Sequence, residues 1–404
     1  MNKGPELSFI SLQVDYWDGP WQNRQGFVSE LAKKAKVLFV SPPLHLEQVI
    51  RPRSKQRTAM AGLQHVEHGL WSYVPPRFLP VNHRLRALER GFRRLRQRRL
   101  QRVCHELSMT QPATILFHPH AAPVVLESLS RPIIYYKYDH YAGYGGVPAE
   151  RQRFVDERER RLFDFADLVF VTSSGLLELH RTDAPNRIHL LPNGVDYPAF
   201  SGAQTLGSPL PDDLVNIPRP RLGYVGQINE KINLRLLRDL ASRRRDYSFV
   251  LAGTYRSRDS VADEAFHALI AEPNVYFLGQ KPHKQIPNYL AGLDVGLMPY
   301  VLTEWVRFGY PLKLHEYLAT GLPSVSSVLP ELEPFRDVVT LADSNQEWLE
   351  AIDAAVRSGT DAALKEKRRS IARANSWEVR VDKFLRIVSP LCIGQHRELP
   401  RSSL

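Results

Sequence analysis

Residues 311–325 read P-L-K-L-H-E-Y-L-A-T-G-L-P-S-V, which predicts a short helix, a turn with Gly and Pro, and an apolar strand. Lys313 and Glu316 are three residues apart, so on a helix they share one face. Tyr310 and Pro311 lie at the expected helix start, where proline suits the first turn and free backbone N–H groups can bind a phosphate. Lys313 would add a full positive charge there, and Glu316 would accept hydrogen bonds from a diol such as a ribose. The pattern predicts a nucleotide site; the simpler alternative is a surface helix with a Lys/Glu pair.

The same stretch resembles the donor-nucleotide helix of GT-B glycosyltransferases of the family-4-like type, the glycosyl transferases group 1. With a late S-W-E-V-R segment at 376–380, three further stretches extend the resemblance in the expected order: 191–196 (L-P-N-G-V-D), 222–231 (L-G-Y-V-G-Q-I-N-E-K) and 275–300. The resemblance covers most of the second half of the chain, and the first half matches only loosely. It implies an α/β protein in which two Rossmann-like domains with parallel sheets face each other across a cleft.

Apolar runs that alternate with helical patterns also indicate two α/β domains. The expected strands are 8–12, 37–40, 114–117, 133–136 and 168–171 in the first half, and 221–225, 248–252, 275–278, 295–298 and 324–327 in the second. A polar stretch rich in Gly, Ser and Pro reads as a linker at 201–220. We therefore expect an acceptor-side domain at 1–200 and a donor-binding domain at 221–375. By the resemblance, a helix at about 376–404 crosses back to complete the first domain.

Glycines and cations after the predicted strands mark the expected donor side. In G-Y-V-G-Q (223–227) the two glycines allow a ligand to approach the backbone, and Lys231 would reach a diphosphate, with a plain surface lysine as the alternative. The resemblance implies that the loop 279–283 walls the nucleobase and that M-P-Y (298–300) lies beside it. The predicted donor-binding residues are Lys231, Lys313, Glu316, Leu312, Tyr300, Gly226 and His283.

The resemblance also contains a departure that bears on catalysis. Retaining members carry two glutamates separated by seven residues, and Phe308 stands where the first would be. The stereochemical outcome therefore stays open, because an inverting enzyme needs a general base on the acceptor hydroxyl. Asp139, in Y-Y-K-Y-D-H-Y after the strand 133–136, is the candidate base; a loop-capping aspartate is the alternative.

Other polar side chains follow strands of the first domain. His118 and His120, in F-H-P-H-A, and Arg24, at the end of the aromatic loop 15–24, are expected on the acceptor or diphosphate side. The alternatives are that the two histidines only form a turn and that the loop 15–24 packs on its own domain. The chain has no D-x-D triplet, so we expect no metal or other cofactor. Cationic side chains and a helix N-terminus would stabilise the leaving diphosphate instead.

The positive charge of the chain is concentrated in one segment. Residues 84–102 hold nine arginines and one glutamate, Glu89, within a net charge of +11 for the whole chain. An apolar stripe of Leu85, Leu88, Phe92 and Leu95 runs through the segment at helical spacing. A solvated basic face and a nucleic-acid site are the alternatives to docking on anionic lipid. The resemblance favours lipid, and the expected membrane-binding residues are Arg93, Arg94, Arg98 and Arg99.

Composition sets the remaining bounds. The 404 residues, 43% hydrophobic and 24% charged, suffice for two folded domains. Two distant cysteines, no leader-like N-terminus and no apolar run near 20 residues predict a cytoplasmic protein at the inner face of the membrane. We expect a glycosyltransferase that moves a sugar from a nucleoside diphosphate sugar to a glycan or lipid-linked acceptor in surface polysaccharide synthesis. The alternatives are a nucleotide-sugar epimerase or hydrolase and a basic nucleic-acid-binding protein.

Overall fold

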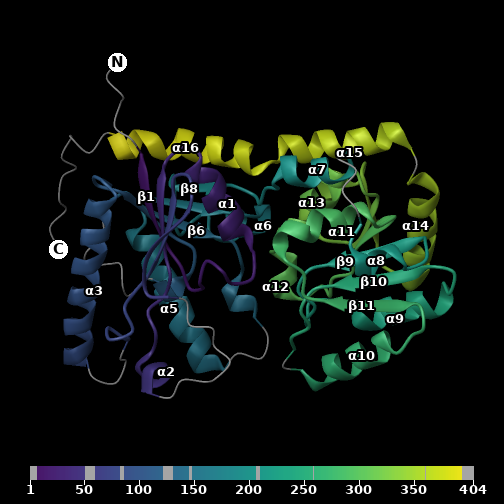
Figure 1. The fold of residues 1–404 in the computed structure, drawn as a ribbon, viewed down its shortest axis with the longest axis horizontal. Coiled ribbons are helices and arrows are strands. Elements are labelled where there is room, and N and C mark those ends of the chain that lie inside the picture. The colour runs from purple at the N-terminus through teal and green to yellow at the C-terminus, as the bar shows by residue number, and fades with distance from the viewer. Residues whose placement is uncertain are drawn as a thin grey trace.

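The computed structural model describes residues 7–50, 60–81, 86–121, 131–144, 148–205, 210–257, 259–359 and 361–393. Its described part forms two α/β domains side by side, each built on its own sheet (Figure 1). The predicted fold class is therefore confirmed.

The N-terminal sheet has eight strands in the order β3-β4-β2-β1-β5-β6-β7-β8. All neighbours in it are parallel except β3 and β4, which form an antiparallel edge. Its strands are β1 (Ser8–Leu12), β2 (Lys36–Val40), β3 (Gly62–Glu67), β4 (Leu70–Val74), β5 (Ala113–Leu116), β6 (Ile133–Lys137), β7 (Leu168–Val171) and β8 (Ile188–Leu190). The central strands are buried on both faces, which is why they read as continuous apolar runs.

The C-terminal sheet has six parallel strands in the order β11-β10-β9-β12-β13-β14. They are β9 (Arg221–Val225), β10 (Ser248–Ala252), β11 (Val275–Gly279), β12 (Val295–Met298), β13 (Ser324–Ser327) and β14 (Val339–Ala342). Because the strands are parallel, the loops that follow them gather at one edge of the sheet.

Helices cover the faces of both sheets. In the N-terminal half they are α1 (Asn23–Ala32), α2 (Leu46–Ile50), α3 (Arg86–Glu106), α5 (Ala149–Phe165) and α6 (Ser174–Leu179), with 3₁₀ turns η1 (Pro119–Ala121) and η2 (Tyr141–Gly143). The C-terminal half adds α7 (Tyr197–Thr205), α8 (Asp212–Val215), α9 (Leu234–Arg243), α10 (Ser260–Ile270), α11 (Ile286–Ala291), α12 (Glu304–Arg307), α13 (Leu312–Thr320), α14 (Asn345–Ser358), α15 (Ala362–Ala374) and α16 (Trp377–Ile393), with η3 (His283–Gln285) and η4 (Pro330–Phe335). Within the described residues, no helix is long and apolar enough to cross a membrane.

The chain crosses between the domains twice. Figure 1 shows α15 along the C-terminal domain and α16, in yellow, continuing along the N-terminal domain. Trp377, Phe384 and Val388 of α16 are buried in the same cluster as Phe9 and Phe27 of the N-terminal domain. The last helix thus completes the core of the first domain.

Of the segment 201–220, expected to be a linker, the structure describes residues 201–205 and 210–220. They contain the end of α7 and all of α8. Leu214 and Ile217 are buried in one cluster with Val225 of β9, so they pack in the core of the C-terminal domain. Apolar residues spaced among Gly, Ser and Pro supply that packing.

Candidate active site

Three neighbouring strands of the C-terminal sheet lead into glycines with positive φ. The values are +152° for Gly226, directly after β9, +155° for Gly253, directly after β10, and +66° for Gly279, the last residue of β11. A Cβ on Gly253 would overlap the carbonyl oxygen of Gly226, and the Gly253 N–H donates to the Gly279 carbonyl at 2.8 Å. Only glycine allows this approach, and it leaves a backbone surface without side chains. Gly253 was not predicted, although L-A-G-T follows an expected strand as Y-V-G-Q does.

The helix α13 stands beside this surface, and its start agrees with the sequence prediction. Pro311 is its N-cap residue, and Gly321, with φ +75°, ends it in a left-handed conformation. A Cβ on Gly226 would collide with the Lys313 side chain, so this lysine lies across the glycine. Its Nζ is 3.8 Å from Oε2 of Glu316, longer than a hydrogen bond. Both side chains therefore keep capacity to bind a ligand.

Hydrogen bonds of Asn193 and His315 hold Tyr310, just before α13. Asn193, from the L-P-N-G-V-D segment, donates from Nδ2 to the Tyr310 carbonyl at 2.7 Å. The Tyr310 hydroxyl lies 2.8 Å from Nε2 of His315. Burial lowers the pKa of His315 to about 3. Leu312, predicted to bind donor, packs instead against the apolar cluster of the N-terminal domain. Its side chain ties α13 to the other domain.

Two predicted nucleotide-pocket residues, Tyr300 and His283, lie near Glu316. Burial, with a smaller contribution from the nearby Glu316 charge, raises the pKa of Tyr300. The pKa of His283 is lowered by burial, an effect that Glu316 opposes. The His283 ring stacks on Trp21 of the N-terminal domain, with ring centres 4.3 Å apart and planes 10° from parallel. This pair connects the two domains beside the donor residues.

Trp305 joins two candidate residues that lie in different domains. Its Nε1–H donates to Oδ1 of Asp139 at 2.5 Å, and Nζ of Lys231 lies 3.4 Å from its ring centre. The Tyr144 hydroxyl donates to the other oxygen of Asp139 at 2.6 Å. Burial lowers the pKa of Lys231, and the nearby Asp139 carboxylate opposes this lowering. The prediction missed Trp305; a tryptophan in the polar T-E-W-V-R loop is the only sequence signal for it.

Phe308, which replaces the first glutamate of the paired motif, fills the contact between the domains. Its ring centre lies 4.7 Å from that of His140, and a Cβ on Gly175 would press on the same ring. The carboxylate of this loop belongs to Glu304, whose Oε1 is 3.4 Å from Nε2 of His140. The position of the missing acid is therefore apolar and packed.

His118 and His120, predicted to lie on the acceptor or diphosphate side, lie together after β5 of the N-terminal domain. The His120 N–H donates to Nδ1 of His118 at 3.0 Å, and the two rings stack with centres 4.8 Å apart. Burial, together with the nearby charges of His120, Arg24 and Lys137, lowers the pKa of His118 to about 3. His118 also contacts Tyr141, with ring centres 4.5 Å apart.

Arg24 does not face an acceptor phosphate as expected. It is 2% exposed, and its guanidinium binds the Asp15 carboxylate, Gln22 and the Tyr138 hydroxyl. The start of α1 and the loop before it therefore use this arginine for their own packing, since a buried guanidinium needs such partners.

The basic helix α3 lies at the outer edge of the N-terminal domain, away from the C-terminal domain (Figure 1). Arg94, Arg98 and Arg99 are exposed and Arg93 is half-buried. Leu88 and Leu95 of the apolar stripe are 43% and 46% exposed. Arg84 and Leu85, which also belong to the predicted basic segment, lie outside the described residues.

One arginine of α3 has a structural role that its sequence position does not reveal. Arg96 is buried, donates to the carbonyls of Leu79 and Pro80, and pairs with Glu89 at 2.5 Å. Val103 and Cys104 anchor the end of the helix in the core. Leu88 and Leu95 are thus exposed while Arg96, Val103 and Cys104 hold the helix to the domain.

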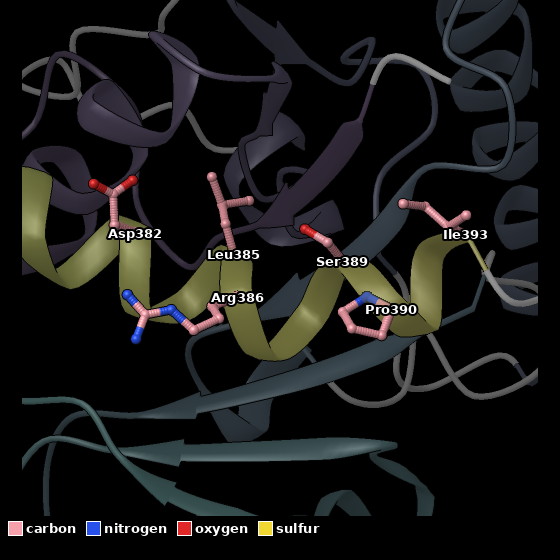
Figure 2. Close-up of a pocket in the computed structure, with 6 residues that line it drawn as sticks. All are labelled: Asp382, Leu385, Arg386, Ser389, Pro390 and Ile393. Atoms are coloured by element: carbon pink, nitrogen blue, oxygen red, sulfur yellow. The ribbon is translucent and has the colours of Figure 1, made fainter. Parts of the chain in front are cut away.

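A surface hollow elsewhere is unrelated to these residues. Figure 2 shows its lining along α16: Asp382, Leu385, Arg386, Ser389, Pro390 and Ile393. In the described part of the chain, no group of three or more His, Cys, Asp or Glu side chains is arranged to hold a metal ion.

The C-terminal domain is similar to a known protein family. Residues 219–358 match the sequence model of the family described as glycosyl transferases group 1. The TuaH protein of Bacillus subtilis (strain 168), named as a glycosyltransferase of teichuronic acid biosynthesis, is 28% identical over 236 residues, 56% of this chain. The EpsF protein of the same organism, also named as a glycosyltransferase, is 27% identical over 183 residues, 43% of this chain. The alignments span 58% and 46% of the lengths of these two relatives.

Solved structures share the whole fold at low identity. A sucrose-phosphate synthase from Thermosynechococcus elongatus superposes with a TM-score of 0.71 at 14% identity, covering 96% of this chain and all of that one. HepE of Anabaena, in complex with UDP and glucose, gives 0.65 at 15% identity with the same coverage. WaaG, a glycosyltransferase involved in lipopolysaccharide biosynthesis, gives 0.61 at 15% identity, covering 94% and 99% of the two chains. The predicted GT-B fold is confirmed.

Proposed function

We propose that this chain, a GT-B protein with a group 1 glycosyl transferase domain, transfers a sugar from a nucleoside diphosphate sugar to a glycan or lipid-linked acceptor. One observation carries the proposal: Lys313 lies across Gly226, with Glu316 one turn further along α13. A cation, a bare backbone surface and a carboxylate at a helix start suit a diphosphate joined to a ribose.

On the donor side, charge would do most of the chemical work. As the bond between the anomeric carbon and the diphosphate breaks, negative charge grows on the leaving oxygen. Lys313, the N–H groups at the start of α13 and Lys231 would stabilise that charge, while Glu316 binds the ribose hydroxyls. The UDP complexes of HepE support a nucleotide donor for this fold.

On the acceptor side, Asp139 is proposed to take the proton of the attacking hydroxyl. It lies on the loop after β6 and receives hydrogen bonds from Trp305 and Tyr144. An acceptor hydroxyl would donate to the same oxygen as Trp305, and we propose that Trp305 moves to admit it. The oxygen would then attack the anomeric carbon as its proton passes to Asp139 and the diphosphate leaves.

The proposed setting is surface polysaccharide synthesis at the inner face of the membrane. TuaH is named for teichuronic acid biosynthesis, and WaaG for lipopolysaccharide biosynthesis. The exposed arginines and leucines of α3 would hold the enzyme on anionic lipid, where a lipid-linked acceptor lies.

A panel of nucleotide sugars tests the proposal. Thermal shift should select one sugar nucleotide, and that compound should release nucleoside diphosphate only when a glycan or lipid-linked acceptor is present, with a mass increase of the acceptor. Release without an acceptor would indicate a hydrolase, and an isomerised sugar would indicate an epimerase. Binding of none of the sugar nucleotides would overturn the proposal.

A further inference from the structure

Arg158 of α5 faces His120 on the acceptor side, outside the residues used above. Its Nη1 lies 3.5 Å from Nδ1 of His120, at the limit of a hydrogen bond. Its guanidinium carbon lies 3.8 Å from the ring centre of Phe154, which is 45% exposed. Stacking on the phenylalanine holds the guanidinium in place. Its N–H groups, which lie in the plane of the guanidinium, remain able to bind an anion.

The carboxylates around Arg158 are bound elsewhere. Asp156 accepts from Gln152 at 2.8 Å, Glu157 pairs with Arg161 at 2.7 Å, and Glu159 pairs with Lys137 at 2.5 Å. Within the described residues, the half-buried Arg158 guanidinium forms no ion pair, and the nearby Glu157 carboxylate is itself paired with Arg161. A guanidinium beside an imidazole is an arrangement that an anion completes.

We propose that Arg158 and His120 form a subsite for an anionic group of the acceptor, either a phosphate or a sugar carboxylate. The inference rests on the proposed function and names its acceptor class. Contacts connect the subsite to the candidate base: His120 stacks on His118, His118 contacts Tyr141, and Tyr141 contacts Tyr144, which hydrogen-bonds Asp139. The anionic group therefore binds at a distance from the reacting hydroxyl, on the same face of the N-terminal domain.

The charges around His120 predict how binding depends on pH. Burial lowers its pKa, and Arg158 and Arg151 of α5 and His45 before α2 lower it further. His118, the neighbour on its own loop, is neutral at pH 7 because its pKa is about 3. A bound anion opposes the charges of Arg158 and Arg151 and raises the pKa of His120, so by linkage an anion of constant charge binds more tightly as the pH falls.

Three probes test the subsite without requiring catalysis. Glucose 1-phosphate, methyl glucuronide and uncharged methyl glucoside are titrated by calorimetry, with histidine ring signals followed by NMR. We expect one or both anions to bind, and the glucoside to bind at least tenfold more weakly. Methyl glucuronide, whose carboxylate stays ionised over this range, should bind more tightly at pH 6 than at pH 8, whereas the phosphate of glucose 1-phosphate itself gains a proton at about pH 6. The tighter anion identifies the group as phosphate or carboxylate.

Variants assign the binding to this place. Arg158→Gln and His120→Gln should each weaken anion binding at least tenfold, whereas Arg161→Gln, an exposed arginine of the same helix, should not. Lys313→Ala should leave the binding unchanged, which separates this subsite from the donor residues. Equal affinity of Arg158→Gln and the unmodified protein, no binding of either anion, or equal binding of the glucoside would overturn the inference. If nucleotide sugars bind but these variants have no effect, the proposed function stands and only the subsite fails.

Discussion

The indole N–H of Trp305 donates a 2.5 Å hydrogen bond to Asp139, and this bond joins the short helix α12 to the loop after β6 in the other domain. The same indole ring lies over Lys231 at 3.4 Å. The Trp305 side chain thus contacts both the candidate base, Asp139, and a candidate diphosphate ligand, Lys231. We expect substrate binding to require its displacement.

Removing the Trp305 ring should therefore favour the donor. Trp305→Ala releases Lys231 from a cation–π contact worth about 0.5–2 kcal/mol, so nucleoside diphosphate affinity should rise by roughly 2- to 30-fold in calorimetry. Trp305→Phe is the matched control, because it keeps a ring over Lys231 while losing the N–H. Weaker donor binding by the alanine variant would show instead that Trp305 belongs to the donor site.

Asp139→Asn should lower turnover by about a hundredfold or more and leave donor affinity nearly unchanged, because general base catalysis contributes on that scale. Steady-state rates and calorimetry measure the two effects separately. Asp18→Asn, an exposed aspartate of the N-terminal domain, is the control. If Asp139→Asn retains activity, a retaining mechanism without a protein base becomes the better account.

Buried His315 should make stability depend on acid. Its pKa is about 3 in the folded protein, below the ordinary value of 6.5, so between these values the unfolded state binds a proton that the folded state does not. Its contribution to the free energy of unfolding should fall by about 1.4 kcal/mol per pH unit below pH 6.5. Urea unfolding at pH 6 and pH 5 should show a correspondingly smaller pH dependence for His315→Gln. Exposed His105→Gln should keep the original slope, and an unchanged slope in both variants would refute the assignment.

The surface of α3 should bind anionic vesicles. Phosphatidylglycerol vesicles should sediment the protein, neutral phosphatidylcholine vesicles should not, and added salt should release it, because the Debye length is about 10 Å at 0.1 M. Replacing Arg93, Arg94, Arg98 and Arg99 by glutamine should abolish sedimentation and spare donor binding.

The matched control replaces four other exposed arginines by glutamine. Three are on α5 and one is in the turn after α6: Arg153, Arg160, Arg161 and Arg181. It should sediment like the unmodified protein. Arg96 is left unchanged in both sets because its buried bonds hold the helix. Binding to nucleic acid without binding to lipid would favour the alternative ligand.

Local sequence patterns predicted much of this fold and part of the site. Six predicted strands, among them 8–12 and 248–252, have the observed bounds, because parallel strands buried on both faces are continuous apolar runs. Four strands were missed: β3, β4, β8 and β14. Of these, β3 and β8 are mostly half-buried or exposed and lack such a run. The helix α13 was predictable because its cap, its charges and its final glycine lie within ten residues of one another.

The parts of the site that were missed depend on contacts between distant segments. Trp305 and Asp139 are 166 positions apart, and His120 and Arg158 are 38 apart. No local periodicity indicates such pairs. The burial of Arg24 was missed for the same reason, since the Tyr138 hydroxyl to which it donates lies 114 positions away.

The central claim is that Lys313 and Glu316 bind a nucleoside diphosphate, and calorimetric titration of nucleoside diphosphates into Lys313→Ala tests it most directly. We expect one nucleoside diphosphate to bind the unmodified protein and Lys313→Ala to lose about 2 kcal/mol, roughly 30-fold in affinity, the scale of a charged hydrogen bond. Lys367→Ala, a lysine of the same domain that is 47% exposed and paired with Asp337, should bind as the unmodified protein does. Equal affinity of all three proteins would contradict the account.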